Sequence, residues 1–95
     1  MFEQLGLIGC GLMGGSFALA LKEAGLVRQV VGYSKSARTR ERALDLGVID
    51  LEAATLEQAV AGSDLVLLAV PVAATESSLA AIAPVLAPRA LLMDV

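Results

Sequence analysis

The sequence predicts an α/β fold in three layers, with helices on both faces of a parallel sheet. Short apolar runs of strand length alternate with stretches of helical periodicity along the 95 residues, which indicates parallel strands joined by crossover helices. Hydrophobic residues make up 57% of the chain and almost all of them are aliphatic, a composition that suits strands buried on both faces. The length allows a single domain, residues 1–95.

Local patterns place each element. Buried strands are predicted where apolar and β-branched residues cluster, at residues 4–8, 29–33, 48–51, 65–70 and 91–95. Helices are predicted where apolar residues recur at helical spacing or where caps mark their ends, at residues 12–24, 36–46, 55–61 and 72–86.

Cap and turn residues set the ends of these helices. Ser36 and Thr55 are predicted N-caps, and Gln58 stands at the capping-box spacing from Thr55. Gly47 is expected to close the second helix, and Pro84 to bend or end the last turn of the fourth.

The charge is unevenly distributed. The formal net charge is −3, yet six of the seven basic residues lie between Lys22 and Arg42. Local positive charge in an acidic chain favours a small anionic ligand over a polyanion, so no nucleic-acid partner is predicted. The single cysteine, Cys10, allows no intrachain disulfide, and a cytoplasmic location is expected. No metal site is predicted.

Two apolar stretches have a composition that a membrane segment also shows, but their context argues against it. Residues 7–10 resemble a lipoprotein cleavage site, yet no basic segment precedes them. Residues 65–88 are interrupted by Pro71, Glu76 and Pro84, which indicates a strand followed by a helix. No membrane association is predicted.

A glycine-rich loop follows the first predicted strand and opens the first predicted helix. It reads Gly9-Cys10-Gly11-Leu12-Met13-Gly14, the G-x-G-x-x-G spacing of dinucleotide-binding proteins. Gly9 is expected to make the tight turn, Gly11 to admit a pyrophosphate, and Gly14 to let the helix pack closely. Free N–H groups around Leu12 and Met13 are expected to point at the phosphates. The alternative is that the glycines serve packing alone.

The end of the second predicted strand indicates which dinucleotide is bound. NAD-specific proteins place Asp or Glu about twenty residues after the last loop glycine, where it binds the ribose hydroxyls. This chain has Ser34 there, followed by the potential phosphate donors Lys35, Ser36 and Arg38. NADP is therefore favoured, with NAD as the alternative. An ordinary solvated helix start would explain the same residues without a ligand.

The exit of the predicted strand 65–70 is a further candidate for cofactor contact. Val70 and Pro71 lie at its carboxyl end, where ligands bind in open parallel sheets. Pro71 is expected either to shape one wall for the nicotinamide or simply to begin the next helix.

With these motifs identified, the chain resembles the N-terminal domain of prephenate and arogenate dehydrogenases, the TyrA family of tyrosine biosynthesis. The resemblance extends over the whole chain in register, most specifically in a Gly-Leu-Met-Gly-Gly-Ser run and a Gly-Val-Ile-Asp segment, at residues 11–16 and 47–50. It implies a Rossmann-type cofactor domain followed by a helical, dimerising domain. Many family members have Asp where this chain has Ser34, and that departure also supports NADP.

The resemblance implies an oxidoreductase that uses NAD(P) to oxidise prephenate or arogenate, coupling hydride transfer to loss of a carboxylate. The family's catalytic histidine has no counterpart here because the sequence contains no histidine, so no catalytic residue is predicted. The chain stops on a predicted strand, and it is expected to be a truncated part of a homodimeric enzyme, inactive alone. Two alternatives stay open: another dehydrogenase of the 6-phosphogluconate or β-hydroxyacid type, and a stand-alone nucleotide-sensing module.

Overall fold

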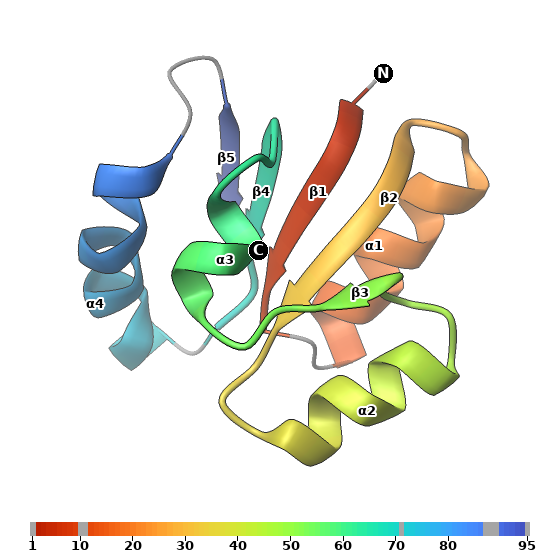
Figure 1. Cartoon of the computed structure of the whole chain (residues 1–95), viewed down its shortest axis with the longest axis horizontal. Coiled ribbons are helices and arrows are strands. Elements are labelled where there is room, and N and C mark those ends of the chain that lie inside the picture. The colour runs from red at the N-terminus through yellow and green to blue at the C-terminus, as the bar shows by residue number, and fades with distance from the viewer. Residues whose placement is uncertain (1, 10–11, 71, 87–89, 95) are drawn as a thin grey trace.

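A single parallel sheet organises the chain (Figure 1). The structure, a computed structural model, describes residues 2–9, 12–70, 72–86 and 90–94. Within them, five strands are arranged in the order β3-β2-β1-β4-β5, and every neighbouring pair is parallel. The predicted α/β class is confirmed.

Strands and helices alternate along the chain. The strands are β1 (Phe2–Ile8), β2 (Val27–Tyr33), β3 (Leu51–Glu52), β4 (Leu65–Leu68) and β5 (Leu91–Asp94). The helices are α1 (Leu12–Glu23), α2 (Ala37–Asp45), α3 (Leu56–Val60) and α4 (Val72–Ile82), with a 3₁₀ turn at Ala83–Val85. No helix in the described part of the chain is long and apolar enough to cross a membrane.

Helices cover both faces of the sheet, as the three-layer prediction requires. Figure 1 shows α3 in front of the sheet and α1 behind it. The face toward α1 and α2 is built from buried residues that include Leu5, Leu7, Ala18, Val30, Ala43 and Leu67. The face toward α3 and α4 includes Ile8, Val31, Ala59, Val66, Leu68 and Ile82. Burying one such large aliphatic side chain contributes about 1.5–3 kcal/mol, so the two layers stabilise the small domain.

The third strand lies later than predicted. Of the range 48–51, only Leu51 belongs to β3, where it pairs with Val31 of β2. The N–H groups of Val48 and Ile49 both donate to the carbonyl of Ala43, at 3.0 and 3.4 Å. These groups therefore close the end of α2 and are not available to a sheet ladder.

The segment before β3 is anchored by Asp50. Its carboxylate accepts the N–H of Val30 at 2.8 Å and pairs with the Lys22 ammonium at 2.8 Å. Lys22 also donates to the carbonyl of Gly47, whose φ of +75° ends α2 as predicted. The Gly-Val-Ile-Asp segment thus ties α1, α2 and β2 together.

Other boundaries differ less from the prediction. β4 ends at Leu68 instead of residue 70 because its partner β1 ends at Ile8, whose carbonyl accepts the last ladder bond from Ala69. The fourth helix gives way after Ile82 to the 3₁₀ turn that contains Pro84, which confirms the predicted break. Residue 95 of the last predicted strand lies outside the described residues.

The predicted cap of α3 is confirmed with one shift. Thr55 Oγ1 accepts the N–H of Gln58 at 3.2 Å, as a capping box requires. The Gln58 side chain accepts the N–H of Ala54 at 3.0 Å, one residue before the cap.

α3 lies directly on the backbone of β1 at Gly6. A Cβ atom at Gly6 would lie 2.4 Å from the Ala59 carbonyl oxygen and 2.9 Å from Ser63 Oγ. The buried Ser63 hydroxyl donates to the same carbonyl at 2.7 Å. Only glycine therefore lets this short helix reach the central strand.

The amino edge of the sheet is held by Asp64. Its two carboxylate oxygens accept the N–H groups of Gln4 and Glu3, each at 3.0 Å, which joins the start of β1 to the turn before β4. Burial alone raises the pKa of the Asp64 carboxyl, but the backbone N–H bonds outweigh it and hold that pKa below its ordinary value of 3.8.

We expect Gly6→Ala to lower the free energy of unfolding by about 2–3 kcal/mol, because the added methyl group forces α3 away from β1. Urea denaturation measures the change. Gly15→Ala is the matched control: a Cβ there would lie an ordinary 3.4 Å from Val48 Cγ1, and alanine favours helix. Equal stability of the two variants would contradict the close approach.

We expect Asp64→Asn to lower the free energy of unfolding by about 1–2 kcal/mol at pH 7. Because the pKa is lowered on folding, this stability is present above the unfolded value and is lost as the pH falls through the folded pKa. The difference between the variant and the unmodified protein should therefore shrink below about pH 4. Glu41→Gln, which removes an exposed charge from α2, should show no such convergence; a difference for Asp64→Asn that is constant with pH would refute the assignment.

Candidate functional site

The carboxyl ends of the three central strands meet at one edge of the sheet. Ile8 is paired with Tyr33 on one side and with Leu68 on the other. Beyond these pairs, the N–H of Gly9 donates to the Tyr33 carbonyl at 2.8 Å, and the N–H of Ala69 donates to the Ile8 carbonyl at 2.8 Å. The sheet order changes direction between β1 and β4, and ligands of open α/β sheets bind at such a switch point.

Gly9 makes the turn that leaves β1. Its φ is +90°, a conformation that side chains disfavour. A Cβ there would also lie 2.2 Å from the carbonyl oxygen of Ala69. The tight turn predicted for Gly9 is therefore confirmed, and two independent reasons exclude any other residue.

Helix α1 begins at Leu12, close to this turn. A Cβ at Gly14 would lie 2.7 Å from the Ala69 Cβ and 2.8 Å from the Gly9 carbonyl oxygen. The close packing predicted for Gly14 is thus confirmed, and contacts within the protein account for both glycines. Leu12 and Met13 lie in the first turn of the helix, while Cys10 and Gly11 lie outside the described residues.

The start of α1 has the electrostatics of an anion site. The first four N–H groups of a helix have no partner within it, and the aligned peptide dipoles make this end positive. The first turn of α1 contains no acidic side chain. No carboxylate of this first turn therefore competes with an anionic group for these N–H groups.

The turn between β2 and α2 presents hydroxyls and cations at the same edge. Ser36 is the N-cap of α2, as predicted, and its Oγ accepts the N–H of Thr39 at 3.3 Å. The Oγ of the half-buried Ser34 accepts the N–H of Ser36 at 3.4 Å. Lys35 and Arg38 are exposed, and neither forms an ion pair with another described residue.

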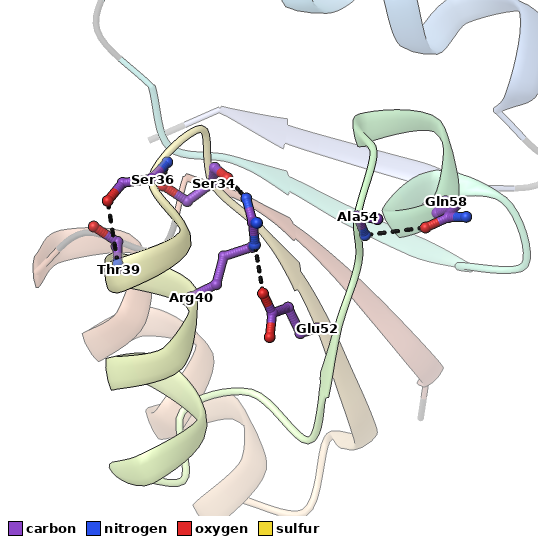
Figure 2. A network of polar contacts seen from close by, with 7 residues as sticks. All are labelled: Ser34, Ser36, Thr39, Arg40, Glu52, Ala54 and Gln58. Carbon is purple, nitrogen blue, oxygen red and sulfur yellow. Dashed lines mark hydrogen bonds and ion pairs between the residues drawn. The ribbon is translucent and has the colours of Figure 1, made fainter.

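Arg40, near the start of α2, is bound to this turn, although the sequence does not single it out. Figure 2 shows its side chain between Ser34 and Glu52. The guanidinium donates to the Ser34 carbonyl, and its Nε donates to Glu52 Oε1 at 2.7 Å. Arg40 is one of several basic residues in the region, and its partner Glu52 is twelve residues away on strand β3, so spacing alone gives no signal for it.

Part of the predicted site is therefore brought together at the carboxyl edge. The turn at Gly9, the start of α1, the Ser34 turn and the half-buried Val70 after β4 all follow strand ends on this edge. Pro71 lies outside the described residues. A helix N-terminus beside a cationic, hydroxyl-bearing turn can bind an extended ligand with more than one anionic group.

Comparisons with known proteins agree with this arrangement. Residues 17–95 match the profile of the family described as "Prephenate dehydrogenase, nucleotide-binding domain". The cyclohexadienyl dehydrogenase of Zymomonas mobilis is 38% identical over 94 residues, which are 99% of this chain and 32% of that protein. The profile match begins after the glycine loop, so it is independent of the loop motif.

Solved structures show the same fold. The crystal structure of prephenate dehydrogenase from A. aeolicus, in complex with hydroxyphenyl propionate and NAD+, matches with a TM-score of 0.89 at 28% identity, over 99% of this chain and 33% of that one. Synechocystis arogenate dehydrogenase matches with a TM-score of 0.87 at 27% identity, over 98% of this chain and 32% of that one.

The described sheet is of the Rossmann type that these dehydrogenases share. The chain spans about a third of the length of the relatives it matches. Since the family profile covers most of its residues, the chain belongs to the prephenate dehydrogenase family, of which it forms the nucleotide-binding domain.

Proposed function

We propose that the chain binds a nicotinamide dinucleotide across the carboxyl edge of the sheet, with NADP preferred over NAD. The observation that carries the preference is Ser34 directly after β2, in a turn that offers hydroxyls and the exposed cation Lys35 and leads to the exposed Arg38 at the start of α2. A charge-assisted hydrogen bond to a 2′-phosphate is worth about 1.5–3 kcal/mol, or about ten- to a hundredfold in affinity.

The residues at this edge fit such a cofactor. We assign the pyrophosphate to the N-terminus of α1, with Gly9, Gly11, Leu12, Met13 and Gly14. The 2′-phosphate and its ribose go to Ser34, Lys35, Ser36 and Arg38, and the nicotinamide to Val70 and Pro71. Support comes from the start of α1, whose first turn contains no acidic side chain, and from the A. aeolicus enzyme, whose structure contains NAD+.

We further propose that the protein acts in the oxidation of prephenate or arogenate, in a cytoplasmic homodimer. The bound cofactor would accept the hydride. The part of this chain is to bind and orient the cofactor, because the sequence contains no histidine to deprotonate the substrate hydroxyl. Similarity to dehydrogenases of both substrates supports this function over the β-hydroxyacid type and over a sensing module.

We expect NADPH to bind about tenfold more tightly than NADH, and Ser34→Asp to reverse this order because its carboxylate repels the 2′-phosphate. Isothermal titration calorimetry measures both dissociation constants. Ala80→Asp adds the same charge to the exposed face of α4, near its end and toward the amino edge of the sheet. It should change neither dissociation constant. Equal affinities of the unmodified protein for both cofactors would refute the preference.

We also expect the 95 residues to bind the cofactor without oxidising prephenate or arogenate. Cofactor binding needs only the carboxyl edge, whereas the reaction needs a proton acceptor at the substrate. Reduction of NADP or NAD, followed at 340 nm with either substrate, tests this. Turnover above the rate without protein would contradict the assignment of chemistry to residues outside this chain.

A further inference from the structure

Arg40 connects the turn after β2 to β3, the outer strand on that side of the sheet. Its Nη1 donates to the carbonyl of Ser34 and its Nε donates to Glu52 Oε1 at 2.7 Å (Figure 2). Its guanidinium also lies over the Tyr33 ring, 5.9 Å from the centroid. The side chains of Arg40 and Glu52 are 16% and 31% exposed, so water screens this ion pair only partly.

Both ends of this connection are held by other elements. Glu52 lies on β3, opposite Gly32 of β2, and the next residue, Ala53, donates its N–H to the Gly32 carbonyl at 2.9 Å. Arg40 lies near the start of α2, where Ser36 caps the first turn. The guanidinium therefore joins two fixed elements, and the Ser34 carbonyl is held against them.

This contact fixes the peptide between Ser34 and Lys35. In a trans peptide the N–H points opposite the preceding C=O, so a carbonyl held by Arg40 directs the Lys35 N–H away from Arg40. The Ser34 hydroxyl is held separately, since it accepts the N–H of Ser36. The shape of the turn is thus set by the protein's own contacts.

The basic residues of the turn and of the start of α2 differ in whether an acidic side chain pairs with them. Arg40 is already neutralised by Glu52, whereas Lys35 and Arg38 form no ion pair with any described residue. The charge available to a phosphate is therefore that of Lys35 and Arg38, while Arg40 controls where the turn presents it. A turn held in its binding shape loses less conformational entropy when a ligand arrives.

We infer that Arg40 is a positioning residue for cofactor selection and that Glu52 is its anchor. Together they hold the Ser34 turn in the shape that receives a 2′-phosphate. This inference rests on the proposed binding of NADP at Ser34 and adds to it two residues that need not touch the cofactor.

The test compares Arg40→Ala, Arg40→Lys, Glu52→Gln and the double variant Arg40→Ala/Glu52→Gln. Calorimetry gives the dissociation constants for NADPH and NADH, and circular dichroism gives Tm. We expect Arg40→Ala to weaken the binding of NADPH about tenfold and that of NADH about twofold, because binding of the 2′-phosphate depends most on the shape of the turn. Arg40→Lys should not restore binding, since one ammonium cannot replace the planar guanidinium that holds both oxygens.

Glu52→Gln should weaken NADPH in the same direction but less. The double variant should be no weaker than Arg40→Ala, because both changes act through one side chain. Arg28→Ala and Glu3→Gln are the matched controls, because they make the same charge changes in an ion pair at the amino edge of the sheet. In that pair Arg28 Nη1 lies 3.4 Å from Glu3 Oε2, and the side chains are 74% and 70% exposed. Neither control should change either constant.

Two results would overturn this inference but leave the proposed cofactor preference standing. A lower Tm for Arg40→Ala with an unchanged NADPH-to-NADH ratio would mean that Arg40 serves stability only. Tighter NADPH binding by Glu52→Gln would mean that Glu52 competes with the phosphate for Arg40, which would then be a direct ligand. A lack of NADPH preference in the unmodified protein is a different result, since it refutes the proposed cofactor preference and this inference with it.

Discussion

At the carboxyl end of β1 the backbone of Gly9 lies against the Ala69 carbonyl, and Gly14 of α1 lies against the Ala69 side chain. Because neither glycine has a Cβ atom, the turn, the helix start and the exit of β4 can approach one another at van der Waals distance. Because Gly9 also donates to the Tyr33 carbonyl, the end of β2 joins the same cluster. The candidate site depends on this backbone approach before any side chain contributes to it.

The amino and carboxyl edges of the sheet differ in how far their polar groups are satisfied within the protein. At the amino edge, polar groups bond to one another: Gln29 donates to Gln4, Gln4 donates to Ser63, and Ser63 donates to the Ala59 carbonyl. Asp64 adds its two backbone bonds there. These contacts satisfy each other within the protein. At the carboxyl edge, by contrast, the start of α1 and the cations Lys35 and Arg38 leave donors available to a ligand.

Much of the fold could be predicted from sequence because its signals are local. The buried strands, the caps at Ser36 and Thr55, and the break at Pro84 each depend on a few adjacent residues. The third strand could not be placed, since apolar residues at 48 and 49 serve the end of α2 and the core, and pairing with β2 decides where β3 begins.

The same distinction applies to the candidate site. The glycine spacing and the serine at 34 are visible in the sequence, and the turn and packing expected of Gly9 and Gly14 are confirmed. The contacts of Arg40 are not visible in the sequence, because only the tertiary structure brings its partner Glu52 near. Whether Ser34, Lys35, Ser36, Arg38 and Val70 contact a cofactor remains a prediction.

The position of β1 at the centre of the sheet bears on how the domain is assembled during synthesis. β1 is translated before the other strands of this sheet, its pairing with β2 joins Leu5 to Val30, and its pairing with β4 must wait for Leu65. The second pairing closes a much longer stretch of chain, so it is expected to form later. Ala69 completes the carboxyl edge and follows that late strand, so a nascent chain that has folded only its first half has the glycine turn but not the surface against which it is shaped.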